Sequence, residues 1–377
     1  MIDLLVDTSI IPLILLGLFS LCFLIQMVWL WFFFWRLARK KPAETPANPV
    51  PVSVVICAHN KYSNLKENLP LILEQEYPDF EVLVVDHASD DDTRYLCSYY
   101  SEKYPNFKFL TVSEDLNFFT GKKFPLSIGI KSARYDWILL TDADCRPAGK
   151  EWIRSMMNVT RPETGIVLGY SPFIKGKGLL NKLIRFDNAV NALHYLSFAL
   201  AGIPYMGIGR NLSYRKQLFY ENNGFIAHYR VRSGDDDLFI NQVATSANTS
   251  VTVDPDGFVY APAQESFISW MRMKQRYAST ARLYKFSHKL LLRLFSFSSF
   301  GIVALFILML SLNWSAIPVL VLFSIRLICQ IVVFSGGLKR LRDQDLAPLV
   351  PLFELIMFFV KTWIFIPVIF RTPQRWK

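Results

Sequence analysis

Two groups of carboxylates have the spacing expected of a metal site or a catalytic centre. Asp142 and Asp144 flank one alanine directly after an apolar stretch, and Asp235, Asp236 and Asp237 follow a glycine. Carboxylate oxygens suit Mg²⁺ or Mn²⁺, especially beside phosphates. A carboxylate can also act as general base toward a hydroxyl group, and three adjacent like charges favour a raised pKa for one of them. The alternatives are a solvated turn for the first group and a helix N-terminus for the second.

The elements that must position these groups form an α/β domain over residues 51–265. Helical stretches alternate with apolar segments, and strands are expected at Val52–Ile56, Phe80–Val85, Phe107–Val112 and Trp137–Leu140. This alternation is typical of a largely parallel sheet. Such a sheet binds ligands at the carboxyl ends of its strands, where the second strand delivers Asp86 and the fourth delivers Asp142.

Shorter signals mark the helices that follow these strands. Ser63 is expected to cap the first helix, which Pro70 kinks or shortens, and the acidic run 90–92 is expected to cap the helix that begins at Thr93. Lys122 lies in a Gly-Lys-Lys turn before another helix. That position suits contact with a phosphate, although lysine pairs are more often simply solvated.

The composition places the domain beside a membrane. Of 377 residues, 52% are hydrophobic and 19% charged, which is a low charged fraction for a soluble protein. Eleven basic residues and no acidic one lie between Ser266 and Arg342, mostly beside apolar segments. This distribution fits an anionic membrane surface and speaks against a nucleic-acid partner. The apolar content excludes disorder, and five cysteines without paired spacing exclude a disulfide scaffold.

The N-terminal segment is expected to be an uncleaved membrane anchor over residues 1–41. Ile10 to Trp35 carries no charge and is longer than a bilayer crossing requires. Two aspartates precede it and four basic residues follow it, so the positive-inside rule places the N-terminus outside and the domain in the cytoplasm, at the inner (plasma) membrane. Residues 42–51 read as a proline-rich spacer leading to a domain at 52–285.

A second membrane region is expected over residues 286–377. Residues 294–312 and 317–334 are long enough to cross, and Arg326 in the latter is expected to face protein rather than lipid. Residues 350–370 either span the bilayer or re-enter it, because a full crossing would leave the basic residues after 370 outside.

Five motifs occur in order and together resemble a membrane-anchored family 2 glycosyltransferase of the GT-A fold. They are Asn60, Val84-Val85-Asp86 with Ser89 and Asp90, Gly121-Lys122-Lys123, Asp142-Ala143-Asp144 and Ser233-Gly234-Asp235-Asp236-Asp237-Leu238. The likeness covers about residues 51–280, and the apolar flanks fit the same branch. It implies an α/β, Rossmann-like GT-A domain with a mostly parallel sheet, flanked by transmembrane helices.

The resemblance implies a nucleotide-diphosphate sugar as donor, expected to be a UDP-sugar, and a lipid or glycan acceptor. Asp144 would be the better ligand of the Mg²⁺ or Mn²⁺ ion, with Asp142 near the ribose or the metal. Asp86 would contact the nucleobase of the donor. The residues expected to contact the donor are Asn60, Asp86, Lys122, Asp142 and Arg276. A fuller motif around Arg276 would carry Gln and Trp where this chain has Met273 and Tyr277, which weakens the case for processive synthesis.

The same resemblance makes Asp236 the general base and Asp235 the preceding acid, in a single displacement that inverts the anomeric centre. The glycine-rich stretch 206–211 lacks the spacing of a dinucleotide site and is expected to shape the acceptor side. Two other functions stay open, a nucleotidyltransferase of related fold and a catalytically silent membrane scaffold. Intact Asp144 and Asp236 speak against the scaffold, and the acidic block after a glycine favours sugar transfer.

Overall fold

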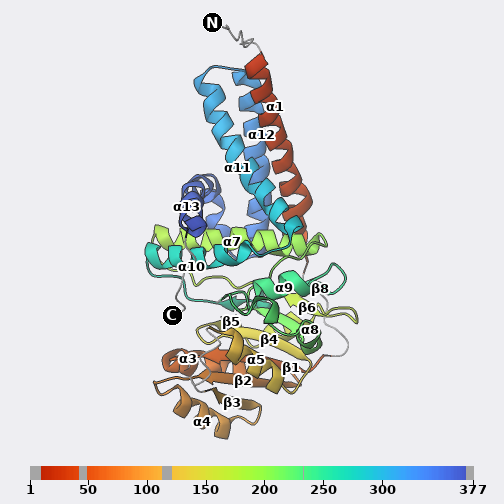
Figure 1. Cartoon of the computed structure of the whole chain (residues 1–377), viewed down its shortest axis with the longest axis vertical. Helices are drawn as coiled ribbons and strands as arrows, with labels where there is room; N and C mark the ends of the chain where they lie inside the picture. Colours follow the sequence, from red (N-terminus) through yellow and green to blue (C-terminus); the bar gives the residue numbers. More distant parts are fainter. Residues whose placement is uncertain (1–9, 42–48, 113–120, 232, 371–377) are drawn as a thin grey trace. The chain divides into compact units, whose positions relative to one another are not determined.

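The structure is a computed structural model, and it describes the chain except residues 1–9, 42–48, 113–120, 232 and 371–377. Most of the proline-rich spacer and the basic C-terminal tail therefore lie outside the described residues. The chain divides into two compact units, each continuous in space but not in sequence (Figure 1). One unit comprises Met1–Arg39 with Lys285–Thr362, and the other comprises Lys40–Tyr284 with Trp363–Lys377.

The second unit is built on a seven-stranded sheet with strand order β3-β2-β1-β4-β7-β6-β8. Its parallel half consists of β1 (Val52–Ala58), β2 (Phe80–His87), β3 (Phe107–Val112) and β4 (Trp137–Asp142). The other half consists of β7 (Leu212–Arg215), antiparallel to both β4 and β6 (Ile166–Leu168), and β8 (Thr249–Val251), parallel to β6. A separate two-stranded sheet pairs β5 (Arg146–Pro147) with β9 (Val259–Tyr260).

Helices of the same unit pack against this sheet or against one another. They are α3 (Tyr62–Leu73), α4 (Thr93–Lys103), α5 (Lys123–Ser132), α6 (Trp152–Met157), α7 (Leu179–Leu200), α8 (Lys216–Glu221), α9 (Asp237–Val243) and α10 (Phe267–Ala281). Helix α5 approaches the sheet so closely that a Cβ atom on Gly129 would lie 2.6 Å from Val55 Cγ1. Helices α7 and α10 lie side by side, joined by an ion pair of 2.8 Å between Asp187 and Lys274 (Figure 1).

The strands match the sequence prediction closely, whereas one predicted helix cap is wrong. Strand β3 has the predicted bounds, and β1, β2 and β4 each continue two residues further at the carboxyl end. Helix α3 begins at Tyr62 rather than after Ser63, because the Tyr62 N–H donates to Asp91 Oδ2 at 3.0 Å. The same carboxylate accepts from the Thr93 N–H at 3.0 Å, as a cap from the acidic run requires.

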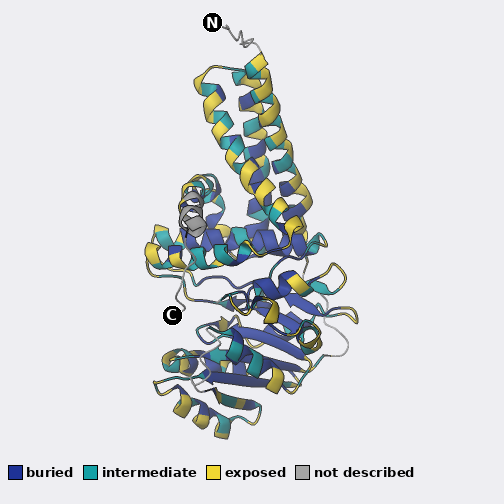
Figure 2. Ribbon diagram, viewed as in Figure 1, coloured by how far each residue is buried: buried dark blue, intermediate teal, exposed yellow. Residues whose placement is uncertain are grey.

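The other unit contains three helical segments long and apolar enough to cross a membrane, among the described residues. The first joins α1 (Ile10–Val28), a π-helical turn η1 (Trp29–Phe34) and α2 (Trp35–Arg39), and the others are α11 (Phe286–Ser311) and α12 (Ala316–Arg340). Figure 2 shows exposed residues along the outer faces of these helices, and they include Leu13 and Phe297, each 71% exposed. Apolar side chains facing outward are expected of helices surrounded by lipid.

A polar cluster fixes α13 (Val350–Phe370) to this unit. Arg326 is 2% exposed, so it faces protein as predicted. Its guanidinium donates to Glu354 at 2.5 and 2.8 Å, to Gln330 at 2.7 Å and to Gln26 at 3.3 Å. A charge among apolar helices is tolerated when it is paired in this way. The α/β domain with its apolar helices confirms the predicted fold class.

Candidate active site

The carboxyl ends of the parallel strands bring Asp86 and Asp142 to either side of β1. In the strand register, Ala58 lies opposite Asp86 and Cys57 lies opposite Asp142. Asp86 is 1% exposed, and its Oδ1 is buried with no hydrogen-bond partner among the described residues. A buried carboxylate oxygen without a hydrogen-bond donor is rare, so Asp86 Oδ1 is an unpaired acceptor at the end of the strand.

Asn60 holds the loop beside Asp86. Its backbone φ is 53°, a left-handed conformation that asparagine tolerates. Its N–H donates to Ser89 Oγ at 2.9 Å, and its side-chain oxygen accepts from the Asp90 N–H at 2.8 Å. These contacts occupy Asn60 in joining the loops that follow β1 and β2, so it shapes the wall of the site.

Lys122 forms an ion pair with Asp142 just before α5. Burial lowers the pKa of Lys122, but the carboxylates of Asp142 and Asp235 outweigh it and hold the pKa well above the usual value. Burial likewise raises the pKa of Asp142, but three cations, Lys122, Arg210 and Arg276, bring the net pKa below its ordinary value. Positive charge from three separate elements therefore converges on Asp142.

Asp144 completes a group of possible metal ligands. One ligand atom each from Asp142, Asp144 and Cys145 lies within 4.8 Å of the others. Burial raises the pKa of Cys145 well above its usual value, so this residue is a thiol, and its Sγ lies 3.6 Å from Asp144 Oδ1. The partly exposed carboxylates of Asp142 and Asp144 are therefore the charged groups available to bind a cation. Lys61 Nζ lies 3.8 Å from Asp144. Such an oxygen pair fits a hard cation such as Mg²⁺ or Mn²⁺.

Asp236 caps the N-terminus of α9, and its two oxygens have different backbone partners. Oδ1 accepts from the Asp237 N–H at 2.7 Å and Oδ2 from the Gly209 N–H at 2.8 Å. A Cβ on residue 209 would lie 3.3 Å from this carboxylate, so glycine permits the approach. Burial, with the charges of Asp235 and Asp237, raises the pKa of Asp236 to about 7.

Asp237 is committed to holding α9 and α10 together. Its Oδ2 accepts from the Thr280 hydroxyl at 2.5 Å and the Tyr284 hydroxyl at 2.7 Å, and its Oδ1 accepts from the Leu238 N–H at 2.8 Å. Burial raises its pKa, and the two hydroxyl hydrogen bonds oppose that rise. The carboxylate is 7% exposed and saturated with donors, which indicates a structural role.

Asp235 differs from its two neighbours in the acidic block. It is half-buried, and within the described parts of the chain no hydrogen bond reaches its carboxylate. Its charge favours the protonated forms of both Lys122 and Lys123, although burial outweighs this effect on the pKa of Lys123. Asp235 therefore lies toward the end of the site that holds Asp142.

The lysine pair at the start of α5 is not simply solvated, so that alternative is wrong. Lys123 is 5% exposed, and its ammonium donates to the carbonyls of His228 at 2.6 Å and Val231 at 2.7 Å. Burial lowers its pKa to about 8, against the raising effect of the three aspartates. Lys123 therefore fixes the segment that leads into the acidic block, a role that depends on partners about a hundred residues away.

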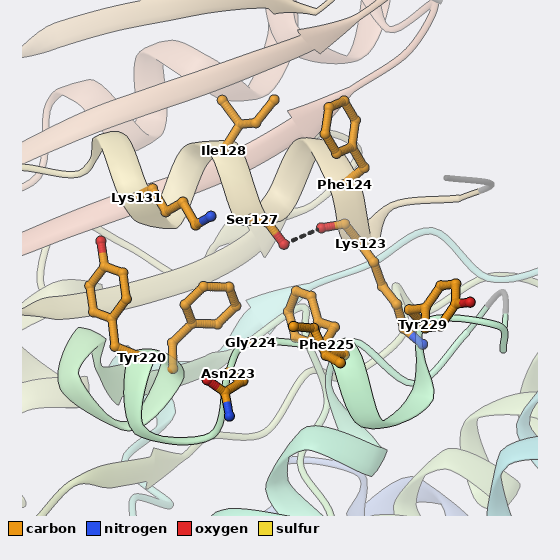
Figure 3. Close-up of a pocket in the computed structure, with 12 residues that line it drawn as sticks. Lys123, Phe124, Ser127, Ile128, Lys131, Tyr220, Asn223, Gly224, Phe225 and Tyr229 are labelled. Atoms are coloured by element: carbon orange, nitrogen blue, oxygen red, sulfur yellow. Dashed lines mark hydrogen bonds between the residues drawn. The ribbon is translucent and has the colours of Figure 1, made fainter. Parts of the chain in front are cut away.

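A cavity of 470 Å³ lies between α5 and the segment from Phe219 to Tyr229 (Figure 3). Aromatic and aliphatic side chains line it, with Lys123 and Lys131 on the α5 side. None of the residues predicted for the site lines this cavity, and its lining carries no carboxylate. The charged residues described above therefore lie outside this cavity, at the carboxyl ends of the parallel strands.

Sequence reasoning missed Arg210, whose charge acts on Asp142 together with that of Arg276. Arg210 belongs to the glycine-rich stretch that was assigned to the acceptor side. The sequence shows a basic residue directly after Gly209. Which carboxylate this residue acts on depends on where the loop lies in the folded chain, and the sequence alone does not give that position.

A mostly parallel sheet with paired carboxylates at its strand ends, joined to apolar helices, defines a membrane-associated glycosyltransferase of the GT-A fold. A model of glycosyl transferase family 21 matches residues 11–377, and the chain belongs to this family. The resemblance to GT-A glycosyltransferases that the motifs indicated is confirmed.

Named relatives and a solved structure agree with this class. Poly-beta-1,6-N-acetyl-D-glucosamine synthase of Staphylococcus epidermidis is 31% identical over 93 residues, which is 25% of this chain and 21% of that relative's length. Poly(ribitol-phosphate) beta-N-acetylglucosaminyltransferase TarS of Staphylococcus aureus is 25% identical over 215 residues, 56% of this chain and 36% of TarS. A mannosyltransferase of Pyrobaculum calidifontis, solved with GDP-Man and Mn²⁺, has a TM-score of 0.55 at 17% identity, covering 92% of this chain and 98% of its own, and shows the shared fold.

Proposed function

We propose that this glycosyltransferase moves a sugar, with inversion, from a nucleotide-diphosphate sugar to a lipid or glycan acceptor at the inner face of the plasma membrane. The observation that carries the proposal is the convergence on Asp142 of two cations expected to contact the donor, Lys122 by a direct ion pair and Arg276 through its charge. Such a group of cations suits the diphosphate of a donor. A UDP-sugar is the expected donor, since two relatives are named for transfer or polymerisation of N-acetylglucosamine.

The donor side uses the strand ends of the parallel sheet. Asp144 and Asp142 would hold the divalent cation, which supplies charge neutralisation on the diphosphate as it leaves. Lys122 and Arg276 contact phosphate oxygens. Asp86 offers its open Oδ1 to an N–H group of the base, and Asn60 keeps the surrounding loop in place.

The acceptor side uses the acidic block, where a carboxylate must take the proton of the attacking hydroxyl. Asp237 already has three donors, and each oxygen of Asp236 already accepts one backbone N–H. Asp235 has no such partner among the described residues, which supports it as the proton acceptor, with Asp236 beside it. The expectation from sequence places the base at Asp236, so the pair is proposed and variants must separate its members. The proposal uses one base and places no second carboxylate as a nucleophile, so the transfer is a single displacement that inverts the anomeric centre.

The membrane assignment is part of the same proposal. The anchor (1–41), spacer (42–51), catalytic domain (52–285) and C-terminal membrane region (286–377) keep the bounds expected from sequence. Residues 350–370 span the bilayer or re-enter it. A cytoplasmic domain would meet its nucleotide-sugar supply directly.

The test is donor hydrolysis by the full chain in nanodiscs. We expect slow, Mn²⁺-dependent release of sugar from a UDP-sugar without acceptor, and loss of that release in Asp144→Asn. GDP-sugars serve as the comparison for base specificity. A folded protein that neither binds nor hydrolyses any nucleotide sugar would contradict the proposal.

A further inference from the structure

Arg210 lies in a loop that the fold holds rigidly on both sides. On one side, the Gly209 N–H donates to Asp236 at 2.8 Å. On the other, Asn211 is completely buried, and its side chain donates to the carbonyls of Tyr170 and Gly257, each at 2.8 Å. The backbone of Arg210 is therefore fixed directly beside the acidic block.

The side chain of Arg210 is held without being neutralised. Its guanidinium lies 4.7 Å from the centre of the Phe173 ring, and its Nη2 lies 3.5 Å from Asn188 Oδ1, a long contact with a neutral oxygen. Its Nε is buried with no hydrogen-bond partner among the residues that the structure describes. No carboxylate lies within 4.0 Å of it in the described chain. A buried donor on a charged group is costly to leave unpaired, so this arrangement calls for an anion.

Arg276 repeats this arrangement from a different element. It lies on α10, and its guanidinium is 5.5 Å from the centre of the Tyr277 ring. Within the described part of the chain, its Nε is also buried without a hydrogen-bond partner. Both arginines act electrostatically on Asp142. The carboxylate of Asp142 is already engaged by Lys122, so it is not the dedicated ion-pair partner of either arginine. Arginine is well suited to bind phosphate through two parallel hydrogen bonds.

We propose that Arg210 binds the donor diphosphate together with Arg276, on the side that faces the acidic block. This inference rests on the proposed function and adds a residue to it. In the transfer, the bond between the anomeric carbon and the diphosphate oxygen breaks, and its electron pair stays on that oxygen. The acceptor oxygen forms the new bond to the anomeric carbon, and its proton passes to the carboxylate pair Asp235 and Asp236. Arg210 stabilises the charge left on the diphosphate.

The experiment measures binding of UDP and GDP with Mn²⁺, and of uridine, to the full chain in detergent by calorimetry. Arg210→Gln is expected to weaken the binding of whichever diphosphate the wild type takes by about 10- to 100-fold, the effect of losing hydrogen bonds to a charged group. Binding of uridine, which has no phosphate, should not change. The matched control is Arg272→Gln, an exposed arginine on α10 outside the site, which should leave both affinities unchanged.

Arg210→Lys is a second variant for the case that Arg210→Gln does not fold. It keeps the positive charge but lacks the planar guanidinium group, which can form two parallel hydrogen bonds. It should weaken diphosphate binding less than Arg210→Gln does. If Arg210→Gln folds and binds the diphosphate like the wild type, the inference is overturned. If Arg210→Gln does not fold, wild-type affinity in Arg210→Lys overturns it. Weak binding in Arg276→Gln and Asp144→Asn with normal binding in the Arg210 variants would leave the proposed function standing without this inference. A wild type that binds neither diphosphate would remove the proposed function itself.

Discussion

At the scale of single residues, Asp144 is the test of metal use. Asp144→Asn should abolish transfer and weaken Mn²⁺-dependent donor binding while leaving the fold intact, because the amide keeps the size of the carboxylate but not its charge. The measurement is turnover and donor affinity after chelation and replenishment with Mn²⁺. Near-normal turnover of the variant under those conditions would show that the pair Asp142 and Asp144 is not the metal site.

The acidic block separates into residues with different partners, and its variants should differ accordingly. Asp235→Asn should lower the transfer rate by at least about 10²-fold, the lower limit for general base catalysis, with little change in donor affinity. Asp237→Asn should act through lost packing between α9 and α10. A variant Asp236→Asn that is inactive while Asp235→Asn turns over normally would return the base to the position expected from sequence.

Asp236 should also make the stability of the fold depend on pH. Its pKa rises from 3.8 to about 7 on folding, because burial and the neighbouring carboxylates disfavour its charge. The favourable contribution of this raised pKa is complete below about pH 4 and is lost as the pH rises through about 7. Asp236→Asn should therefore raise Tm more at pH 8 than at pH 5. An equal shift at both values would mean that Asp236 ionises as freely in the folded protein as in the unfolded chain.

At the scale of elements, the segment that follows α10 supports the start of α9 through Tyr284. Tyr284→Phe removes one hydrogen bond to the buried Asp237 carboxylate, and should destabilise the protein by about 1.5–3 kcal/mol. The matched control is Tyr95→Phe on α4, whose side chain is 77% exposed and should tolerate the change. Chemical denaturation of the two variants and the wild type measures the difference. Equal stability of all three would mean that the Thr280 hydroxyl is a sufficient donor to Asp237 Oδ2.

The sequence predicts the elements of this protein better than the partners of its polar residues. The strands follow from apolar runs such as Phe107–Val112, because burial and alternation are local signals. The roles of Lys123 and Asp237 depend on carbonyls and hydroxyls more than forty residues away, at 228 and 280. Arg210 was missed for the same reason. Short spacing identified the carboxylate groups, but only the folded chain separates the members of the acidic block.

At the scale of the whole molecule, the proposed topology requires all residues between the anchor and α11 to lie on the same side of the membrane. A single cysteine at Ala47, in a chain without its five native cysteines, should be labelled by an impermeant reagent only after cells are permeabilised. The positive-inside rule places this segment in the cytoplasm. Labelling in intact cells would place the domain across the membrane from its nucleotide-sugar supply and contradict the proposed function.

The buried thiol of Cys145 gives the oxygen site a second chemical character. Its sulfur belongs to the same group of ligand atoms, all within 4.8 Å, as the carboxylates of Asp142 and Asp144. Mg²⁺ and Mn²⁺ have little affinity for a protonated thiol, but Zn²⁺ and Cd²⁺ bind thiolates strongly enough to displace the proton. The group of ligands that suits a hard ion such as Mg²⁺ or Mn²⁺ therefore also suits tight binding of a soft ion. We therefore expect Zn²⁺ or Cd²⁺ to inhibit the proposed Mn²⁺-dependent activity through Cys145, the residue that follows the proposed metal ligand Asp144.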